Sequence, residues 1–343
     1  MGSKTGWILA LVLVLVVGGV VYRILNPSPS APKETTAEGF LDLKTVPVPL
    51  REVIGTEPAA PGNAAEDYHK AVQLCVSHAK DIEQSADATR FDGLVASENP
   101  WTDPGLKVCR QIADHVAAGA RKKKMEYTFV CSPRRLSFGY EQAHAKRLAK
   151  VAVALNLCCQ MHTDRKEYAE AEKRIQDMLV FGVHLLEERA LPHVCWEGIE
   201  IQASALLGLR ELYKLWRDAP TNRLGAIRKY ENALRLVDEN HRKKQEILWE
   251  KILATDATTL QPLLAPGDVF NIAENDRDRA WRVQAIITLG AVKYRITDRG
   301  DLRKTRELIQ RFLRSKDAIV AAAAKVANDL TRDQFRNSGT TFD

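Results

Sequence analysis

Apolar residues in the middle of the chain recur at steps of three and four, the spacing of one face of an α-helix. Three such stripes run through residues 148–159, 168–185 and 205–216, with short polar breaks between them. Almost no segment alternates with a period of two, so a sheet is not expected. Because short loops force consecutive helices to pack antiparallel, we expect an all-α fold, built as a solenoid-like array of antiparallel helix pairs.

Two helix starts stand out in the first half of the chain. Asn63 and Glu66 have the spacing of a capping box, in which two side chains satisfy exposed backbone N–H groups. Asp103 followed by Pro104 combines a favoured N-cap residue with a proline at the first helical position. Gly119 is placed to close that second helix.

Polar and proline-containing breaks predict the later helix boundaries. The polar segment 163–166 ends one apolar stripe, and Pro192 precedes another. The segment 218–220 contains a proline and is expected to end that helix. A charged helix is then expected to run from about residue 221 toward residue 254.

An apolar run at residues 7–22 predicts where the protein is located. The run carries no charge, and with its apolar flanks it reaches about the minimum length that crosses a bilayer. Trp7 and Tyr22 lie at its ends, where interfacial aromatic side chains are expected, and Arg23 can extend to the headgroups. We therefore expect a single transmembrane helix that anchors the chain in the membrane via residues 7–22.

A cleaved signal peptide is the alternative interpretation of the same run. The apolar region of a signal peptide is usually shorter, and the residues that follow Tyr22 are too large for a small-x-small cleavage site. Ala31 fits such a site, but Pro32 at the next position disfavours cleavage. The uncleaved anchor is the favoured interpretation.

Flanking charges give the expected orientation of the anchor. Lys4 precedes the apolar run and Arg23 and Lys33 follow it, so the positive-inside count is nearly balanced. A short amino-terminal tail usually stays inside, which predicts a cytoplasmic (inner) membrane protein with its helical domain on the periplasmic side. The lack of obvious cysteine pairs favours the opposite orientation, because oxidising compartments favour disulfides.

Proline content divides the chain into parts. Seven prolines between residues 26 and 62 exclude a long helix there, and this stretch is expected to hold the domain away from the bilayer. The predicted parts are a transmembrane anchor at 1–25, a proline-rich spacer at 26–62, a helical domain at 63–335 and a polar tail at 336–343.

The cysteines and histidines predict no metal site and no cofactor. The six cysteines include no C-x-x-C pair, and the eight histidines include no H-E-x-x-H motif. Cys158 and Cys159 are expected to be small buried hydrophobic side chains. In an oxidising compartment Cys109 and Cys131 are a candidate disulfide, since they bracket a helix and its basic flank.

A basic run at residues 121–124 accounts for part of the formal net charge of +6, and Arg134 and Arg135 follow it closely. Nucleic-acid binders usually show a more basic stripe with interleaved aromatic side chains. Tyr127 and Phe129 follow the run, but a solvated loop is the favoured interpretation. The sequence therefore argues against nucleic acid as the partner.

The densest group of reactive side chains is His193, Cys195 and Glu197, near a helix start. A thiolate nucleophile needs a base within reach, and residues two apart on a helix point to different faces. Glu197 and Glu200 have helical spacing and could face a groove as a glycosidase acid–base pair does, although exposed glutamate pairs are common. No nucleophile, phosphate-loop or calcium-loop motif occurs, so no catalytic, cofactor-binding or metal-binding residue is predicted.

Tryptophans on the expected helices are informative mainly as packing residues, because a large ring usually fills the gap between neighbouring helices. Any that are exposed on a concave face would be candidate binding hot spots. The four that fall on expected helices are Trp196, Trp216, Trp249 and Trp281.

Two segments resemble known helical repeats. The segment 155–178 resembles one tetratricopeptide unit through Tyr168, Ala171, Ile175 and Met178, although the glycine and tryptophan positions of that repeat are not matched. The end of the chain is similar to the second helix of a HEAT-type pair; the residues that carry this similarity are Asp317, Val320, Ala323, Ala324, Ala327 and Leu330. Both resemblances imply stacked antiparallel helices.

The chain also resembles a class of uncharacterised bacterial proteins that have an N-terminal anchor, a proline-rich spacer and an Asn-Ala-Ala-x-x-Tyr helix start. Here that start is Asn63, Ala64, Ala65 and Tyr68. The resemblance implies the same organisation along most of the chain, and it implies no particular activity.

The function predicted from these features is not enzymatic. We expect a membrane-anchored helical scaffold or interaction protein of the cell envelope that binds a protein or peptide partner between stacked helices. The alternative is a hydrolase of envelope polymers with its site on the helical domain. A deep pocket with converging ionisable groups would favour the hydrolase, and a shallow groove with exposed aromatic side chains would favour the scaffold.

Overall fold

A computed structural model describes residues 46–125, 138–188, 192–246, 267–275, 279–292 and 299–338. The first elements are α2 (Leu50–Ile54), β1 (Ala60–Asn63), α3 (Ala65–Ser77), α4 (Ala79–Ser85), α5 (Ala88–Ala96), η1 (Pro100–Thr102), α6 (Pro104–Ala120) and β2 (Lys122–Lys124). The later elements are α7 (Phe138–Asp164), α8 (Tyr168–Glu188), α9 (Pro192–Leu215), η4 (Thr221–Arg223), α10 (Leu224–Gln245), α12 (Gly267–Asn275), α13 (Arg279–Val292), α14 (Arg299–Leu313) and α15 (Ala318–Ser338). The all-α prediction is confirmed for the described residues.

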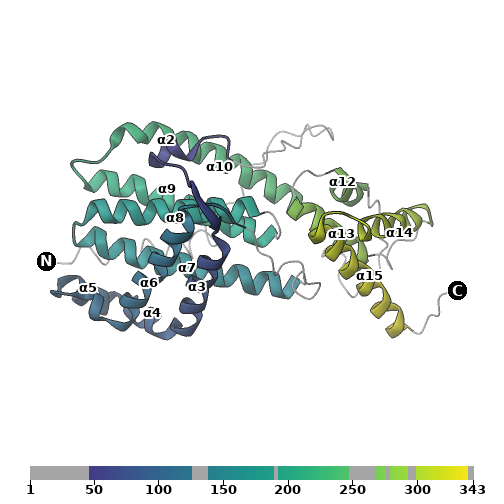
Figure 1. Ribbon diagram of the computed structural model, residues 1–343, viewed down its shortest axis with the longest axis horizontal. Helices are drawn as coiled ribbons and strands as arrows, with labels where there is room; N and C mark the ends of the chain where they lie inside the picture. Colours follow the sequence, from purple (N-terminus) through teal and green to yellow (C-terminus); the bar gives the residue numbers. More distant parts are fainter. Residues whose placement is uncertain are drawn as a thin grey trace.

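The long helices α6 to α10 pack on one another in chain order, and α3 packs against α6 and α7 (Figure 1). The predicted apolar stripes of α7, α8 and α9 form the interior between them, since side chains such as Leu155, Phe181 and Leu206 are almost fully buried. Burying each such side chain contributes about 1.5–3 kcal/mol. The hydrophobic effect therefore fixes which face of each helix points inward.

The C-terminal helices form a second group, in which α13 packs against α12, α14 and α15. Helix α10 runs from the first group toward this second one (Figure 1). The ring of His241 on α10 lies 5.3 Å from that of Trp281 on α13. Trp281 is only 2% exposed, so it fills the space where the two groups meet, as expected for a packing tryptophan.

Helix α6 begins where the sequence predicts. Both backbone N–H groups at its start, those of Gly105 and Leu106, donate to Asp103 Oδ1 at 3.1 Å. The same carboxylate accepts hydrogen bonds from Ser85 at the end of α4 and from Arg90 of α5. Asp103 thus satisfies N–H groups of α6 that would otherwise be unpaired. Because the same side chain binds Ser85 and Arg90, it also holds α4 and α5 in place.

Helix α3 begins at Ala65 with Ala64 as its N-cap residue, one residue later than the capping-box pattern predicts. Asn63 belongs to strand β1, and its side chain still accepts a hydrogen bond of 3.0 Å from the Ala65 N–H. Gly119 does not end α6, which continues to Ala120. A Cβ at Gly119 would lie 2.4 Å from the Tyr68 ring, so this glycine lets α3 approach α6 closely.

The folded part of the chain begins earlier than the predicted boundary at residue 63. Within the predicted spacer, α2 and β1 are formed, and Val53 and Ile54 belong to the hydrophobic core. Pro49 is the N-cap residue of α2 and Gly55 ends it in the left-handed conformation, with φ of 82°. Pro49 therefore marks the start of a short helix, a position where the missing N–H group of proline is tolerated.

The basic run is a strand rather than the predicted loop at residues 122–124. Strand β2 pairs in parallel with β1, with Ala60 opposite Lys122 and Asn63 opposite Lys124. Lys122 Nζ lies 2.6 Å from Asp67 Oδ2 and donates to the Asn63 carbonyl at 3.2 Å. The sequence rule for sheets missed this pairing because three residues are too few to show a period of two.

Among the described residues, no helix is long and apolar enough to cross a membrane. The predicted transmembrane segment at residues 7–22 lies outside the described residues, as do the first part of the spacer and the last five residues of the polar tail.

Candidate functional site

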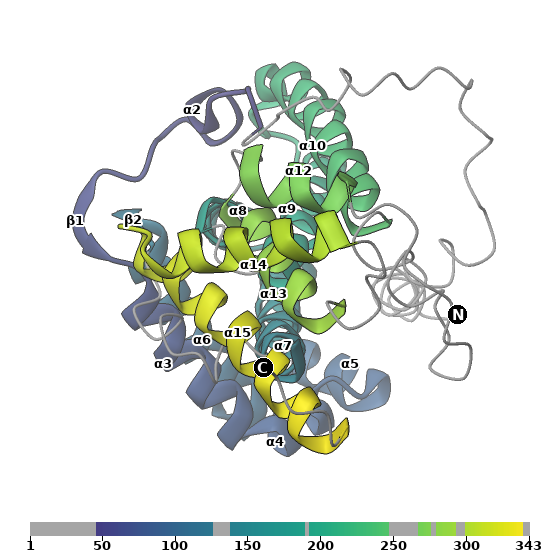
Figure 2. The same ribbon diagram turned by 90° about the vertical axis from the view of Figure 1, so that its right-hand side faces the viewer.

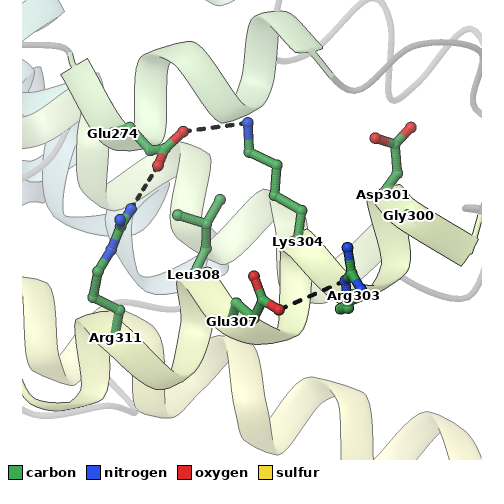
Figure 3. Close-up of a pocket in the computed structure, with 8 residues that line it drawn as sticks. All are labelled: Glu274, Gly300, Asp301, Arg303, Lys304, Glu307, Leu308 and Arg311. Carbon is green, nitrogen blue, oxygen red and sulfur yellow. Dashed lines mark hydrogen bonds and ion pairs between the residues drawn. The ribbon is translucent and has the colours of Figure 1, made fainter.

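One hollow on the described surface lies between α12 and α14 and has a volume of about 450 Å³. Its lining consists mainly of charged side chains: Glu274, Gly300, Asp301, Arg303, Lys304, Glu307, Leu308 and Arg311 (Figure 3). All but Glu274 come from α14. Residues three and four apart on a helix share one face, which is why a single helix supplies this row.

Most of the charges in this hollow are paired with each other. Glu274 lies 2.7 Å from Arg311 and 3.4 Å from Lys304, and one of its oxygens faces each cation (Figure 3). Arg303 lies 3.7 Å from Glu307 on the outer side of α14. The ammonium group of Lys304 also lies 4.7 Å from the centre of the Phe270 ring, a distance at which a cation is attracted to a ring face.

Glu274 is held as a carboxylate. Its pKa lies below the ordinary value because Arg311 donates a hydrogen bond to it, and Lys304 adds to this effect. A general acid at neutral pH needs a raised pKa instead. The hollow between α12 and α14 is therefore suited to binding charged or polar groups, and it does not meet the criterion of a deep pocket with converging catalytic groups.

The second hollow is a groove between α9 and α10 with a volume of about 250 Å³. Its floor is apolar, since Leu206 and Leu234 are almost fully buried and Ile199 is 3% exposed. The other lining residues lie at the rim and are mainly charged: Glu200, Ala203, Glu231, Arg235 and Asp238. An apolar floor with a polar rim is the usual composition of a peptide-binding groove.

The rim carboxylates are held in place by neighbouring side chains. Trp196 Nε1 donates to Glu200 at 3.1 Å, and Arg210 Nη1 donates to both oxygens of Glu231 at 3.2 and 3.3 Å. Asp238 lies 2.9 Å from Arg242. Three carboxylates therefore line the groove. The one basic residue in the described lining, Arg235, has a side chain that is 71% exposed.

The predicted reactive cluster does not assemble into a site. Cys195 is fully buried, and its thiol faces the Leu186 carbonyl on α8 at 3.9 Å. The side chain of His193 lies outside the described residues. Of the predicted glutamate pair, Glu200 lines the groove between α9 and α10 and Glu197 does not. No group of three metal-ligating side chains occurs in the described part of the chain.

The cysteines of α3, α6 and α7 are buried. Cys75, Cys109 and Cys158 are at most 3% exposed, and burial raises the pKa of all three thiols, for Cys158 to about 12. These thiols are therefore poor nucleophiles. Cys109 is a free thiol in the described part of the chain, and Cys131, its candidate disulfide partner, lies outside the described residues.

The tryptophans act as packing residues where they are described. Trp281 is buried, and Trp196 and Trp216 are half-buried. The ring of Trp216 lies 6.3 Å from that of Tyr168, in a stacked arrangement. Trp249 lies outside the described residues. No tryptophan in the described part stands exposed as a binding hot spot.

Comparisons with known proteins returned no relative: no family model matches the chain, and neither a curated protein nor a solved structure is detectably similar to it.

Proposed function

We propose that this protein is a membrane-anchored helical scaffold of the cell envelope, and that the groove between α9 and α10 binds a protein or peptide partner. The apolar floor of that groove, formed by Ile199, Leu206 and Leu234, carries the proposal. Because these three side chains are at most 3% exposed, the area that binding removes from water comes mainly from the apolar side chains of the partner, at about 25 cal/mol per Å². Stacked, solenoid-like helix pairs present long grooves of this kind.

The shape and charge of the groove favour an amphipathic helix as the bound segment. Two neighbouring helices form a trough that accepts the apolar side chains of a third helix. The carboxylates of Glu200, Glu231 and Asp238 stand along the rim, where basic residues beside the apolar stripe of the partner would share Glu231 and Asp238 with Arg210 and Arg242. The anchor at residues 7–22 keeps this groove at the membrane.

Filling the groove with a large side chain tests the proposal. Ala203 lies at the rim and is exposed, so Ala203→Trp blocks the groove without disturbing the core. Ala118 is exposed on α6, away from the groove, and Ala118→Trp is the matched control. Full-length protein of each variant is used for affinity capture from membranes, followed by measurement of binding to the recovered partner.

We expect wild type and Ala118→Trp to bind the partner equally, and Ala203→Trp to bind at least about tenfold more weakly, since each 1.4 kcal/mol of lost contact is tenfold in affinity. Helix content measured by circular dichroism should be the same for all three proteins. Equal binding by the two tryptophan variants would show that the groove is not the binding surface.

A further inference from the structure

The exposed side of α14 and the turn that follows it carries an unusual concentration of positive charge. Residues 299–317 contain seven basic and three acidic side chains, whereas the whole chain has a formal net charge of only +6. All seven basic residues are exposed: Arg299, Arg303, Lys304, Arg306, Arg311, Arg314 and Lys316. We call this set the α14 basic face.

The opposite side of α14 explains why these cations point to solvent. Leu308, Ile309 and Phe312 are buried against the C-terminal helices. Because helical side chains recur every 3.6 residues, fixing this apolar stripe inward turns the charged positions outward. The α14 basic face is therefore held in a defined position by the core of the second helix group.

Several of these cations are available to an external partner. Arg299, Arg314 and Lys316 make no ion pair with any residue that the structure describes. The pair between Arg303 and Glu307 spans 3.7 Å, and its side chains are 81% and 69% exposed, so it contributes little. Lys304 and Arg311 are held at one edge by Glu274.

The α14 basic face also lies at an end of the molecule. Figure 2 looks onto the end of the long axis, and α14 lies across the front of that view. The aromatic side chains next to it, Phe270 and Phe312, are buried beneath it at 3% and 7% exposure. Single-stranded nucleic acid is usually bound by exposed rings on which bases stack, and this face offers none among its described residues.

We propose that the α14 basic face docks against a bilayer surface rich in anionic phospholipid. Dispersed lysine and arginine side chains on an outward-facing helix suit a planar layer of phosphate headgroups, which demands no matching groove. The location of the domain near a bilayer rests on the membrane anchor in the proposed function. Residues 23–45, even fully extended, span at most about 80 Å, so the tether would keep the face at high effective concentration near headgroups.

Binding to separate vesicles tests the α14 basic face while the anchor is inserted in a different bilayer. Full-length protein is held in nanodiscs of neutral phosphatidylcholine and mixed with sedimenting vesicles of phosphatidylcholine alone or with about one third phosphatidylglycerol. We expect co-sedimentation with the anionic vesicles at about 0.05 M NaCl, at least about tenfold weaker binding to neutral vesicles, and release at about 0.5 M NaCl because salt screens exposed charges.

Two triple variants with equal charge changes show whether the α14 basic face is responsible. Arg299→Gln, Arg303→Gln and Arg314→Gln together should weaken vesicle binding by about tenfold or more, because each cation near an anionic surface contributes to attraction. Arg228, Lys229 and Lys243 are exposed on α10. Their joint replacement by glutamine is the matched control, and it should change vesicle binding by less than about twofold.

Three results would overturn the proposal. Equal loss in the two triple variants would mean that only total charge matters, and equal binding to neutral vesicles would exclude phospholipid charge as the cause. Tighter binding of labelled RNA or duplex DNA than of vesicles, at matched phosphate concentration, would assign the face to nucleic acid. Ala203→Trp should leave vesicle binding unchanged, so failure of the groove proposal and failure of this one are separable.

Discussion

Two titratable side chains on α8 have pKa values that burial shifts in opposite directions, downward for His184 and upward for Asp177. Burial lowers the pKa of His184 to about 4 from its ordinary 6.5, because a charged imidazolium is poorly solvated in the interior. Its Nδ1 lies 2.7 Å from the Tyr68 hydroxyl, and the backbone of Lys122 also hydrogen-bonds with the ring. His184 therefore links α3, α8 and β2 as a neutral ring.

Stability should fall as the pH drops from 6.5 toward 4 because of His184. In that window the unfolded chain binds a proton that the folded protein does not, so the stabilisation present above pH 6.5 is lost. We expect this one group to account for up to about 3 kcal/mol of the free energy of unfolding. Urea unfolding of the full chain in non-ionic detergent, with His184→Gln beside wild type, measures it.

The exposed His69 on α3 gives the matched control for that experiment. His184→Gln should show a weaker dependence of stability on pH than wild type between 6.5 and 4, and His69→Gln should follow wild type. If all three proteins show the same dependence, His184 is not a buried neutral residue.

Asp177 should act in the opposite direction. Burial raises its pKa to about 6 from 3.8, against the opposing effects of Arg174 and Lys173, and its Oδ2 accepts no hydrogen bond. Folding therefore favours the protonated acid, and the stabilisation present below pH 3.8 is lost as the pH rises through 6. We expect Asp177→Asn to raise the free energy of unfolding at pH 7.5 by about 1–2 kcal/mol, with no gain at pH 3.5.

Thermal or urea unfolding at the two pH values measures this difference, and Asp218→Asn in the exposed turn after α9 is the control. Destabilisation by Asp177→Asn at pH 7.5 would contradict the account, because it would mean that the charged carboxylate is favoured in the folded protein.

At the scale of elements, the contact between α8 and α9 depends on paired glycines. A Cβ at Gly198 would lie 2.7 Å from the Gly182 carbonyl oxygen and 2.8 Å from the Leu186 nitrogen, both of which are backbone atoms. Gln202 Nε2 donates to the carbonyls of Gly182 and Gly198 at 3.2 and 3.0 Å, and its Oε1 accepts from Tyr230 at 2.8 Å. Three helices are thereby joined by one buried amide.

Gly198→Ala should destabilise the protein by about 1–3 kcal/mol, because the new methyl group forces α8 and α9 apart. Gly225 on α10 has no atom within 4 Å of an added Cβ. Gly225→Ala should therefore be neutral or stabilising by up to about 1 kcal/mol, as alanine favours helices. The denaturation midpoints of the two variants measure this difference. Equal changes in stability would show that the close approach of α8 and α9 at Gly198 is not required.

The sequence predicts the helices well where a periodic stripe and a capping residue agree. Asp103 begins α6 and Pro192 begins α9 as predicted, because each signal acts locally. The pairing of Lys122 with Ala60 was not predictable, since it joins segments far apart in the chain through backbone groups. The role of Gly198 was equally hidden, because close approach of two helices leaves no periodic signal.

The candidate sites could be predicted only in part. Glu200 was noted for its spacing to Glu197, yet the partners that form its groove, Glu231 and Asp238, come from a different helix. The cations of α14 were not singled out in the sequence, because their exposure depends on how α14 packs on its neighbours. Surfaces that combine two helices require the tertiary arrangement.

At the scale of the whole molecule, the apolar run at residues 7–22 predicts integral membrane association. The full-length chain should remain with membranes after a wash in about 1 M NaCl, since burial of apolar residues in the bilayer is not screened by salt. An alkaline phosphatase fusion after Asp343 should be active, because the domain is expected on the periplasmic side. Recovery in the salt-wash supernatant would contradict the anchor, and an inactive but well-expressed fusion would contradict the orientation.

The most direct test of the central claim is site-specific photo-crosslinking in native membranes, with a photoreactive amino acid placed in the full-length chain at Ala203 or, as control, at Ala118. A scaffold whose groove between α9 and α10 holds a partner should give one discrete crosslinked product from position 203 and none from position 118. The Glu231→Lys substitution at the groove rim should reduce that product. No product from position 203, or the same product from both positions, would contradict the account.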